Sequence, residues 1–402
     1  MRRGGRNYYA LDVSNKNDPV FEWQIEGGTG YATELGETWS KLTMAKIRVG
    51  NLIRQVAIFG GGYDNDQDDH YTRTPDGVGR AIYIVDIDTS ELLWAGSINT
   101  AGSNKIEHFP DMEYSFPSNV KVVALGEESL ATQFYIGDMG GRIWRFDINN
   151  GEAAGDKLVD GGIIADFAAD NSTADARRFY HEPDLSLSVV DGKRVINIAI
   201  GSGFQAHPLD EIIEDKFFLV RYPYEDTGNY GIQNGKGGYR PIELNDLFDT
   251  TDNLIQEGTP KQQEAARMAL DAAQGWRIDL DSPGEKILGQ SSTINNVIRF
   301  ISYVPNTGTD ICLPDIGSSR FYQVNLEDGS STTDNPADTR SGNKRRYLDI
   351  PGGGIAPPIQ TLFVPNKDGT KVVPSAVSGP QVLWEGDSNN LLQRLYWSES
   401  PQ

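Results

Sequence analysis

A repeated strand–turn–strand unit constrains this chain more than any other feature of its sequence. Residues 8–23 read YYALDVSNKNDPVFEW, and residues 81–94 read AIYIVDIDTSELLW. In each, an apolar strand ends at an aspartate, a polar turn follows, and a second strand runs to a tryptophan. The aspartate can accept hydrogen bonds from backbone N–H groups two residues on and so fix the turn. The tryptophan can pack a large apolar surface against the neighbouring unit. The aspartates are Asp12 and Asp86, and the tryptophans are Trp23 and Trp94.

Degenerate copies of this unit occur further along the chain. They lie at 142–151 (RIWRFDINNG) and at 320–329 (RFYQVNLEDG, with Asn325 in the aspartate position). A second element, a hairpin with a glycine-rich connection, also recurs. It is found within the segments 54–86, 133–147 and 194–222. These repeats predict many short strands joined by tight turns.

Repeating β units of roughly 40–60 residues are typical of a propeller, in which each blade buries its faces only against its neighbours. Dividing the 402 residues by that period gives about seven blades. We therefore predict an all-β chain that folds as a single β-propeller domain over residues 1–402. A set of unrelated β-sandwich domains is the alternative, and it explains the recurrence less well.

One segment departs from the β pattern. The sequence TPKQQEAARMALDAAQG predicts a helix over 259–274, inside an insertion that spans 224–275. Thr259 is the expected N-cap, Pro260 occupies the first helical position, and Gln262 completes a capping box. We expect this helix to pack on the outside of the propeller.

Composition excludes several classes of function. The net charge of −21 repels phosphate backbones and anionic lipids, which argues against a nucleic-acid or membrane-surface role. The longest apolar runs, such as VINIAI (195–200), reach only strand length, so no membrane-spanning helix is predicted. Cys312 is the single cysteine, which excludes an internal disulfide and any CxxC metal site.

The best candidate for a metal site is YDNDQDDH (63–70). Asp64, Asp66 and Asp68 alternate as the first, third and fifth ligands of a calcium loop do. The sixth position is an aspartate rather than the usual glycine, and Pro75 stands where the last glutamate ligand would be. The sequence leaves two interpretations open, a calcium ion on these three carboxylates or a solvated acidic loop.

Nothing in the sequence indicates an enzyme. GGGY (60–63) and GSGF (201–204) are followed by loop and strand, whereas a phosphate-binding loop needs a helix N-terminus. The four histidines show no metal-binding spacing, and no GxSxG motif is present. We predict a non-enzymatic protein with no cofactor other than a possible calcium ion.

The Asp–turn–Trp units resemble those of quinoprotein-type propellers. Longer phrases, in order along the chain, resemble the C-terminal propeller of the PilY/PilC family of type IV pilus tip adhesins. They are RGGRNYYALDVSNKNDP, LGETWSKLTMAKI with VAIFGGGYD, DMEYSFPSNVKVV, YIGDMGGRIWRFDI, AIGSGFQAHPLDEIIEDKFFLV, GWRIDLDSPGEKILGQS and RLYWSES. The resemblance covers essentially the whole chain.

This resemblance implies a modified seven-bladed propeller, exported through the periplasm of a Gram-negative bacterium to the outer membrane and the pilus tip. It implies roles in pilus assembly, control of retraction, twitching motility and surface adhesion. The implied partners are minor pilins, host or abiotic surfaces, and the N-terminal region of the same protein. Because MRRGGR lacks a signal peptide and strand-like sequence begins at Tyr8, we expect a longer protein with its export signal upstream.

One departure from the family pattern concerns calcium. Many members carry a DxDxDGxxD loop where this chain reads ALGEESLATQF (124–134). Glu127 and Glu128 cannot supply the roughly six oxygen ligands that calcium needs. We therefore expect the family's calcium switch to be absent at this loop.

Two alternative functions remain open on the sequence. One is a quinone-dependent dehydrogenase on a related propeller, and the other is a periplasmic assembly scaffold. The order of the phrases favours the pilus family over both. For contacts with partners we expect the connections 63–80 and 204–215 and the insertion 224–275, because propellers display binding loops on a rigid frame.

Overall fold

The structure is a computed structural model. It describes residues 4–100, 102–125, 127–190, 192–235, 237–280, 282–306, 316–332, 346–365 and 372–385. Cys312 and the phrase RLYWSES lie outside the described residues.

The strands form a succession of mostly antiparallel sheets, each built from a continuous stretch of chain. The first is a two-stranded hairpin, and the next two sheets have five and four strands. Their strands are β1 Asn7–Asp12 and β2 Val20–Glu26; β3 Thr43–Val49, β4 Leu52–Gly60, β5 Ala81–Asp86, β6 Leu92–Ser97 and β7 Ile106–His108; and β8 Lys121–Val123, β9 Gln133–Gly137, β10 Arg142–Ile148 and β11 Val159–Asp166.

Three further sheets of five, five and three strands follow. A separate small hairpin, β15–β16, lies in the insertion. The strands are β12 Asp184–Val190, β13 Lys193–Gly201, β14 Lys216–Pro223, β17 Phe248–Asp249 and β18 Gly275–Asp279; β19 Lys286–Ile287, β20 Ser292–Ile294, β21 Val297–Val304, β22 Ser318–Asn325 and β23 Tyr347–Ile350; β24 Gln360–Pro365, β25 Val372–Ser378 and β26 Gln381–Glu385; and β15 Ile232–Gln233 and β16 Tyr239–Arg240.

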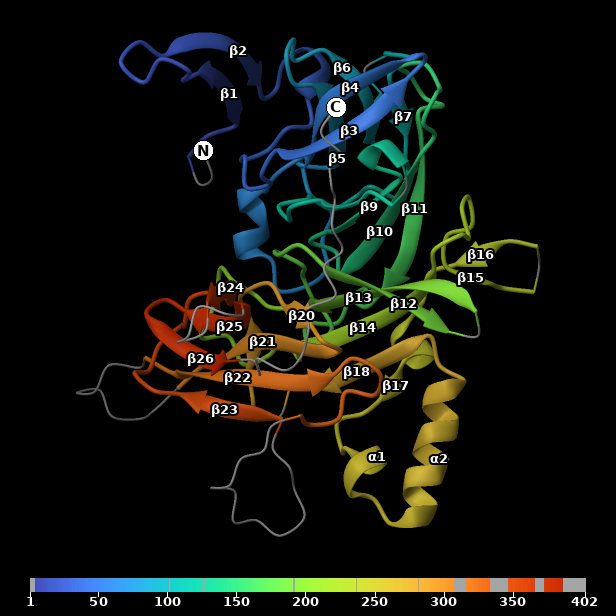
Figure 1. The fold of residues 1–402 in the computed structure, drawn as a ribbon, viewed down its shortest axis with the longest axis vertical. Helices are drawn as coiled ribbons and strands as arrows, with labels where there is room; N and C mark the ends of the chain where they lie inside the picture. Colours follow the sequence, from blue (N-terminus) through green and yellow to red (C-terminus); the bar gives the residue numbers. More distant parts are fainter. Residues whose placement is uncertain are drawn as a thin grey trace.

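These sheets follow one another in chain order (Figure 1). The β3–β7 sheet lies at the top, β8–β11 below it, β12–β18 and β19–β23 across the lower half, and β24–β26 at the lower left. This is the succession of blades expected of a β-propeller, so the predicted fold class is confirmed. Among the described residues the structure has six blade-like sheets, compared with the expected number of about seven.

Apolar clusters fill the space between consecutive sheets. Phe217 of β14 stacks on Phe300 of β21 with ring centres 4.0 Å apart. Trp94 of β6 packs edge-on against Phe134 of β9 and Phe146 of β10, with centroid distances of 6.4 and 5.7 Å. The core is therefore a series of interfaces between blades, as the repeat predicts.

The aspartates of the repeated unit fix turns, as predicted, in most copies. Asp86 accepts hydrogen bonds from the backbone N–H groups of Asp88 at 3.0 Å and Thr89 at 3.2 Å. Asp12 accepts one from the N–H of Ser14 at 2.8 Å. Each turn thus satisfies backbone donors that would otherwise depend on water.

The copy at 142–151 is an exception, and the prediction of a turn aspartate there is wrong. Asp147 lies inside β10 and is buried, because the strand continues to Ile148 before the chain turns. Its carboxylate accepts hydrogen bonds from the guanidinium of Arg145 rather than from turn N–H groups. The sequence pattern placed the end of the strand one residue too early.

Two tryptophans donate hydrogen bonds that join one sheet to the next. The indole N–H of Trp23 in β2 donates to the carbonyl oxygen of Ile87, just after β5, at 2.7 Å. Trp276 in β18 makes the equivalent bond to the carbonyl of Leu326, just after β22, at 3.0 Å. Apolar packing and one directed hydrogen bond therefore both fix how neighbouring sheets lie.

The insertion contains two helices, α1 (Leu254–Glu257) and α2 (Pro260–Asp271). A capping box links Thr259 and Gln262 at the start of α2, as its sequence predicts. Leu270 of α2 packs into the cluster between the β12–β18 and β19–β23 sheets. The two helices lie at the lower edge of the molecule, outside the succession of sheets (Figure 1).

The Trp276 contact can be tested by mutation. Trp276 is fully buried, so Trp276→Phe removes the hydrogen bond to Leu326 and leaves space between two sheets. We expect the free energy of unfolding to fall by about 2 kcal/mol in urea titrations. Met268→Ala on the exposed side of α2 is the control and should change it by less than about 0.5 kcal/mol.

Candidate contact face

The two connections expected to make contacts, 63–80 and 204–215, meet in the structure. Each follows the second strand of its sheet and precedes the third, so both emerge on the same face of the propeller. The Nε2 atom of His207 lies 2.6 Å from the carbonyl oxygen of Asp68. A carbonyl can only accept, so this nitrogen carries the proton and donates. The Tyr71 ring packs against His207, with centroids 5.3 Å apart.

Arg178 joins these two connections from beneath. It lies in the segment that leads to β12, and its side chain is buried. Its guanidinium donates to the side chain of Gln67 at 3.3 Å and to the carbonyl oxygen of His70. The same group lies over the ring of Phe204, 4.2 Å from its centroid. One cation therefore contacts both loops, through hydrogen bonds on one side and a ring face on the other.

Lys286 holds the 204–215 connection from the other side. Its buried ammonium donates to the carbonyl oxygens of Pro208 at 3.1 Å, Asp210 at 2.6 Å and Gly284 at 2.6 Å. Three oxygens satisfy all three donors of an ammonium group. The loop is thus tied to the start of β19, and burial lowers the pKa of Lys286 from its usual value.

Asp64 closes the base of the 63–80 connection. Its carboxylate accepts from the backbone N–H groups of Asp66 at 3.1 Å, Gly77 at 2.7 Å and Val78 at 3.1 Å. It caps the short helix η2, Asn65–Asp69. A single buried carboxylate therefore pins together the two ends of a long loop.

The three aspartates predicted as metal ligands have different surroundings. Asp64 is buried in its hydrogen bonds, Asp66 is exposed, and Asp68 accepts from the hydroxyl of Tyr63 at 2.5 Å. Within the described ranges, no three or more histidine, cysteine, aspartate or glutamate side chains are grouped so as to hold a metal ion. Calcium binding by these residues stays a prediction, and it would require Asp64 to exchange N–H donors for the ion.

The degenerate family loop at 124–134 contains the short helix η3, Glu127–Ser129. The Glu128 carboxylate forms an ion pair with the guanidinium of Arg48, and both side chains are partly exposed. Glu128 has φ of 65°, a left-handed conformation. Among the side chains that the structure describes in this loop, the Glu128 carboxylate is already paired with a cation.

An aromatic cluster that no motif of the sequence predicts lies beside the 63–80 connection. Trp39 and Tyr63 have ring centroids 4.5 Å apart, and Tyr63 lies 5.8 Å from Tyr180. Tyr114 and Met139 complete the cluster. These residues come from five different connections along the chain, and no local pattern in the sequence relates them.

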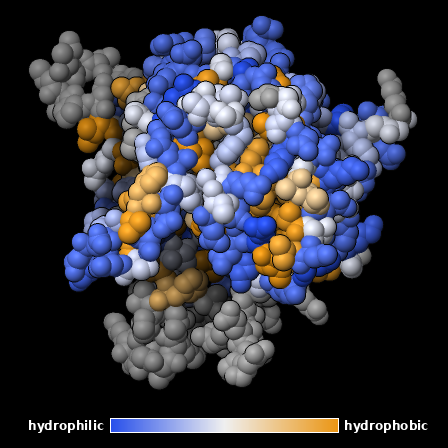
Figure 2. Space-filling view, turned by 90° about the horizontal axis from the view of Figure 1, so that it is seen from above, coloured by the Kyte–Doolittle hydropathy of each residue, from blue (hydrophilic) through white to orange (hydrophobic). Residues whose placement is uncertain are grey.

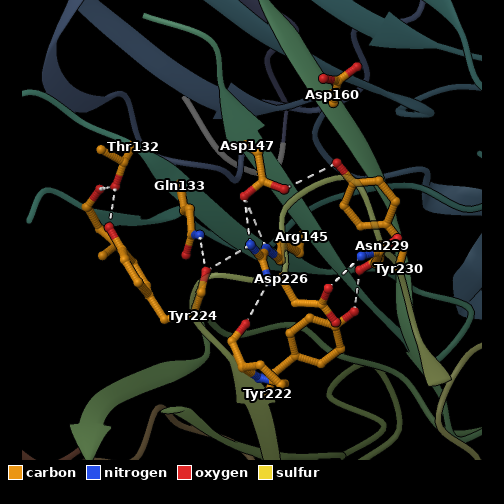
Figure 3. A network of polar contacts seen from close by, with 12 residues as sticks. Thr132, Gln133, Arg145, Asp147, Asp160, Tyr222, Tyr224, Asp226, Asn229 and Tyr230 are labelled. Carbon is orange, nitrogen blue, oxygen red and sulfur yellow. Dashed lines mark hydrogen bonds and ion pairs between the residues drawn. The ribbon is translucent and has the colours of Figure 1, made fainter. Parts of the chain in front are cut away.

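The insertion is anchored by a third buried cation (Figure 3). Arg145 of β10 donates to the Asp147 carboxylate at 2.9 Å and to the carbonyl oxygens of Pro223 at 3.0 Å and Tyr224 at 3.1 Å. Asp147 also accepts from the hydroxyl of Tyr230 at 3.2 Å. The strand residue that was expected to make a turn instead fixes the start of the insertion to the neighbouring sheet.

The class of protein follows from this geometry. The chain is a β-propeller whose inter-strand connections are held by buried charged groups on a frame of packed sheets. Within the described part of the chain, no helix has the length and apolar character needed to cross a membrane.

Comparison with known proteins shows which proteins this chain is similar to. The chain is 27% identical over 148 residues to the type IV pilus biogenesis factor PilY1 of Pseudomonas aeruginosa strain UCBPP-PA14, covering 36% of this chain and 10% of that protein. It is 24% identical over 169 residues to PilY1 of strain PAK, covering 41% and 12%. No family model matches the chain.

The crystal structure of the P. aeruginosa PilY1 C-terminal domain superimposes with a TM-score of 0.60 at 16% identity, covering 95% of this chain and 78% of that one. The chain is therefore a PilY1-like propeller, with the fold of that C-terminal domain. It spans about a tenth of the length of the curated PilY1 proteins that it matches.

The role of Asp64 and the calcium hypothesis can be tested together. We expect Asp64→Asn to lower the free energy of unfolding by about 1–2 kcal/mol, because an amide oxygen accepts hydrogen bonds less strongly than a carboxylate. Asp66→Asn, at an exposed position, should have little effect. Thermal melts with calcium and with a chelator decide the metal question. A rise in melting temperature with calcium that Asp66→Asn and Asp68→Asn abolish would assign a calcium site to these residues. Identical melting temperatures with calcium and with chelator would contradict such a site.

We expect the stability of this face to depend on pH through the buried carboxyl group of Asp76. It accepts hydrogen bonds from Gln67 at 2.7 Å and from the N–H of Ser115 at 2.6 Å, and burial raises its pKa to about 7. A raised pKa means that the folded state binds the proton more tightly than the unfolded state. The stability that proton binding at Asp76 contributes is therefore fully present below about pH 4 and is lost as the pH rises towards 7.

Asp76→Asn removes this titration. We expect the stability of the variant relative to wild type to rise by about 1–3 kcal/mol between about pH 4.5 and 7.5, measured by urea unfolding. Asp69→Asn, an exposed position on the same loop, controls for the change in net charge. A stability difference between Asp76→Asn and wild type that stays constant across this pH range would contradict a raised pKa of Asp76.

Proposed function

We propose that this chain is the propeller domain of a type IV pilus biogenesis protein, and that it acts through contacts rather than through catalysis. The observation that carries the proposal is the PilY1-like fold over 95% of the chain, together with sequence similarity to PilY1 over 36–41% of it. The protein would be exported by a Gram-negative bacterium and act at the pilus tip and outer surface. There it would support pilus assembly, control of retraction, twitching motility and adhesion.

The contact face supports a role in binding. Leu209 and Ile212, on the 204–215 connection, are 48% and 55% exposed. Arg178 and Lys286 hold this connection rigidly, so binding would cost little ordering of the loop. Exposed apolar side chains on a rigid loop are suited to contacts with another protein surface. We propose minor pilins of the tip complex as the partners on this face, with host or abiotic surfaces reached from the assembled tip.

Deletion tests the proposal as a whole. We expect this protein to appear in sheared surface filaments on an immunoblot, and filaments to be lost or strongly reduced in a strain without the gene. A protein confined to the soluble periplasm, with filaments unaffected by the deletion, would contradict a role in pilus assembly.

A surface variant tests the contact face. Leu209→Lys combined with Ile212→Lys places two charges on the exposed side of one loop. We expect about a tenfold or greater loss of surface filaments or of twitching, with the protein still present at normal levels. Val189→Lys, at a more exposed apolar position on β12 (67%), is the control. Equal behaviour of the two strains would place the contacts elsewhere on the molecule.

A further inference from the structure

The first sheet is much less covered than its equivalents. It consists only of β1 and β2, and its side chains Tyr9, Leu11 and Phe21 are 44%, 56% and 56% exposed. In contrast, every residue of β5 and β6, which carry the same sequence unit, is buried. The hairpin lies at the upper left of Figure 1, and Figure 2, which looks onto this end of the molecule, shows orange apolar groups among the hydrophilic ones.

The sequence repeat indicates which positions in a complete blade β1 and β2 occupy. The unit that they share with 81–94 forms the third and fourth strands of the β3–β7 sheet. The indole of Trp23 donates to the end of the third strand of the next sheet. Trp276, which lies in a fourth strand, makes the same kind of contact with its next sheet, so β2 corresponds to a fourth strand. In the described residues the hairpin is therefore the outer half of a blade, without first and second strands.

The residues before β1 support the same assignment. Gly4, Gly5 and Arg6 precede β1 as Gly-Gly-Arg, and the same triplet (140–142) leads into β10. There the two glycines end the connection from the second strand, β9, which pairs antiparallel with β10. By this equivalence, a second strand belongs on the edge of β1 that does not pair with β2.

The neighbouring sheet has an uncovered area in the matching place. Met44 of β3 lies opposite Ala57 of β4, and Ala57 belongs to the cluster that the β1–β2 hairpin covers. Ile53, four residues before Ala57, lies on the same face of the sheet because side chains alternate along a strand. Met44 and Ile53 are 57% and 46% exposed. The hairpin thus covers the outer strands and part of β4 on this face, and it leaves Met44 of β3 and Ile53 of β4 exposed.

We propose that the N-terminal region of the same protein supplies two strands that complete this first blade. The second strand pairs antiparallel with the free edge of β1, and the two strands together cover Met44 and Ile53. Among the described residues β1 pairs with β2 alone, so its other edge presents backbone N–H and C=O groups beside an apolar surface. Such an edge is a ready template for pairing with a further strand. This inference rests on the proposed function only in taking the chain as one domain of a longer protein.

Hydrogen exchange tests the pairing directly. The probe is the complete product of the gene, the longer protein that the proposal requires, compared with the 402-residue chain. A gene product with no sequence before Met1 would itself overturn the proposal. We expect the β1 amides that point away from β2 to exchange about 100-fold or more slowly in the longer protein. Equal exchange rates in the two proteins would overturn the proposal. Protection of β1 in the 402-residue chain that grows with concentration would assign the edge to a second copy instead.

A pair of variants tests the covered face independently. Ile53→Lys should leave the melting temperature of the 402-residue chain unchanged and lower that of the longer protein by about 3 °C or more. Leu187→Lys is matched to it, since Leu187 is also 46% exposed but lies on β12, and it should be tolerated in both. Tolerance of Ile53→Lys in the longer protein would contradict the proposal. Neither measurement depends on pili, so a failed role in pilus assembly would not affect these results.

Discussion

Aromatic packing between neighbouring sheets, reinforced at two junctions by an indole hydrogen bond, is the interaction on which the rest of the structure depends. A propeller sheet cannot bury both its faces alone, so its position depends on a neighbour. Trp23 and Trp276 each donate to a carbonyl oxygen of the following sheet, at 2.7 and 3.0 Å, while Trp94 packs on the rings of the next one. Because the hydrogen bond is directional and the indole is large, these contacts fix both the angle and the spacing between neighbouring sheets. The loops that connect the strands therefore begin and end on strands that are held rigidly in place.

On this frame, buried cations fix the connections in place. Arg178 and Lys286 donate to backbone carbonyls and to one side-chain amide. Arg145, at the base of the insertion, donates to the Asp147 carboxylate and to backbone carbonyls. A buried charge is costly unless all its donors are paired, so each cation strongly favours one loop conformation. Bound calcium can serve the same purpose in a surface loop, because it also gathers backbone and side-chain oxygens. In the described loops 63–80 and 204–215, side chains of the protein supply this function.

The sequence predicted the parts of the fold that depend on local pattern. The Asp–turn–Trp unit, the glycine-rich hairpins and the capped helix at Pro260–Asp271 all follow from residues close together in the chain. Asp147 was misassigned because a strand aspartate beside an arginine and a turn aspartate look alike in one dimension. The meeting of His207 with Asp68 could not be predicted, since 139 residues separate them. Loop pairing of this kind depends on the angle between sheets, which no local pattern encodes.

The same unit of sequence can be fully buried or mostly exposed, and this difference explains how the molecule is organised. Both β1–β2 and β5–β6 end a strand on an aspartate and place a tryptophan against the next sheet, yet only β5–β6 is covered on all sides. The unit therefore specifies a turn and one inter-sheet contact, while burial is supplied by strands on either side. An isolated two-stranded hairpin is marginal in water, and β1–β2 is held here by Tyr8 and Trp23 against the β3–β7 sheet. A blade completed by strands from another region would join that region to the propeller through a continuous sheet, so that the two would move as one body.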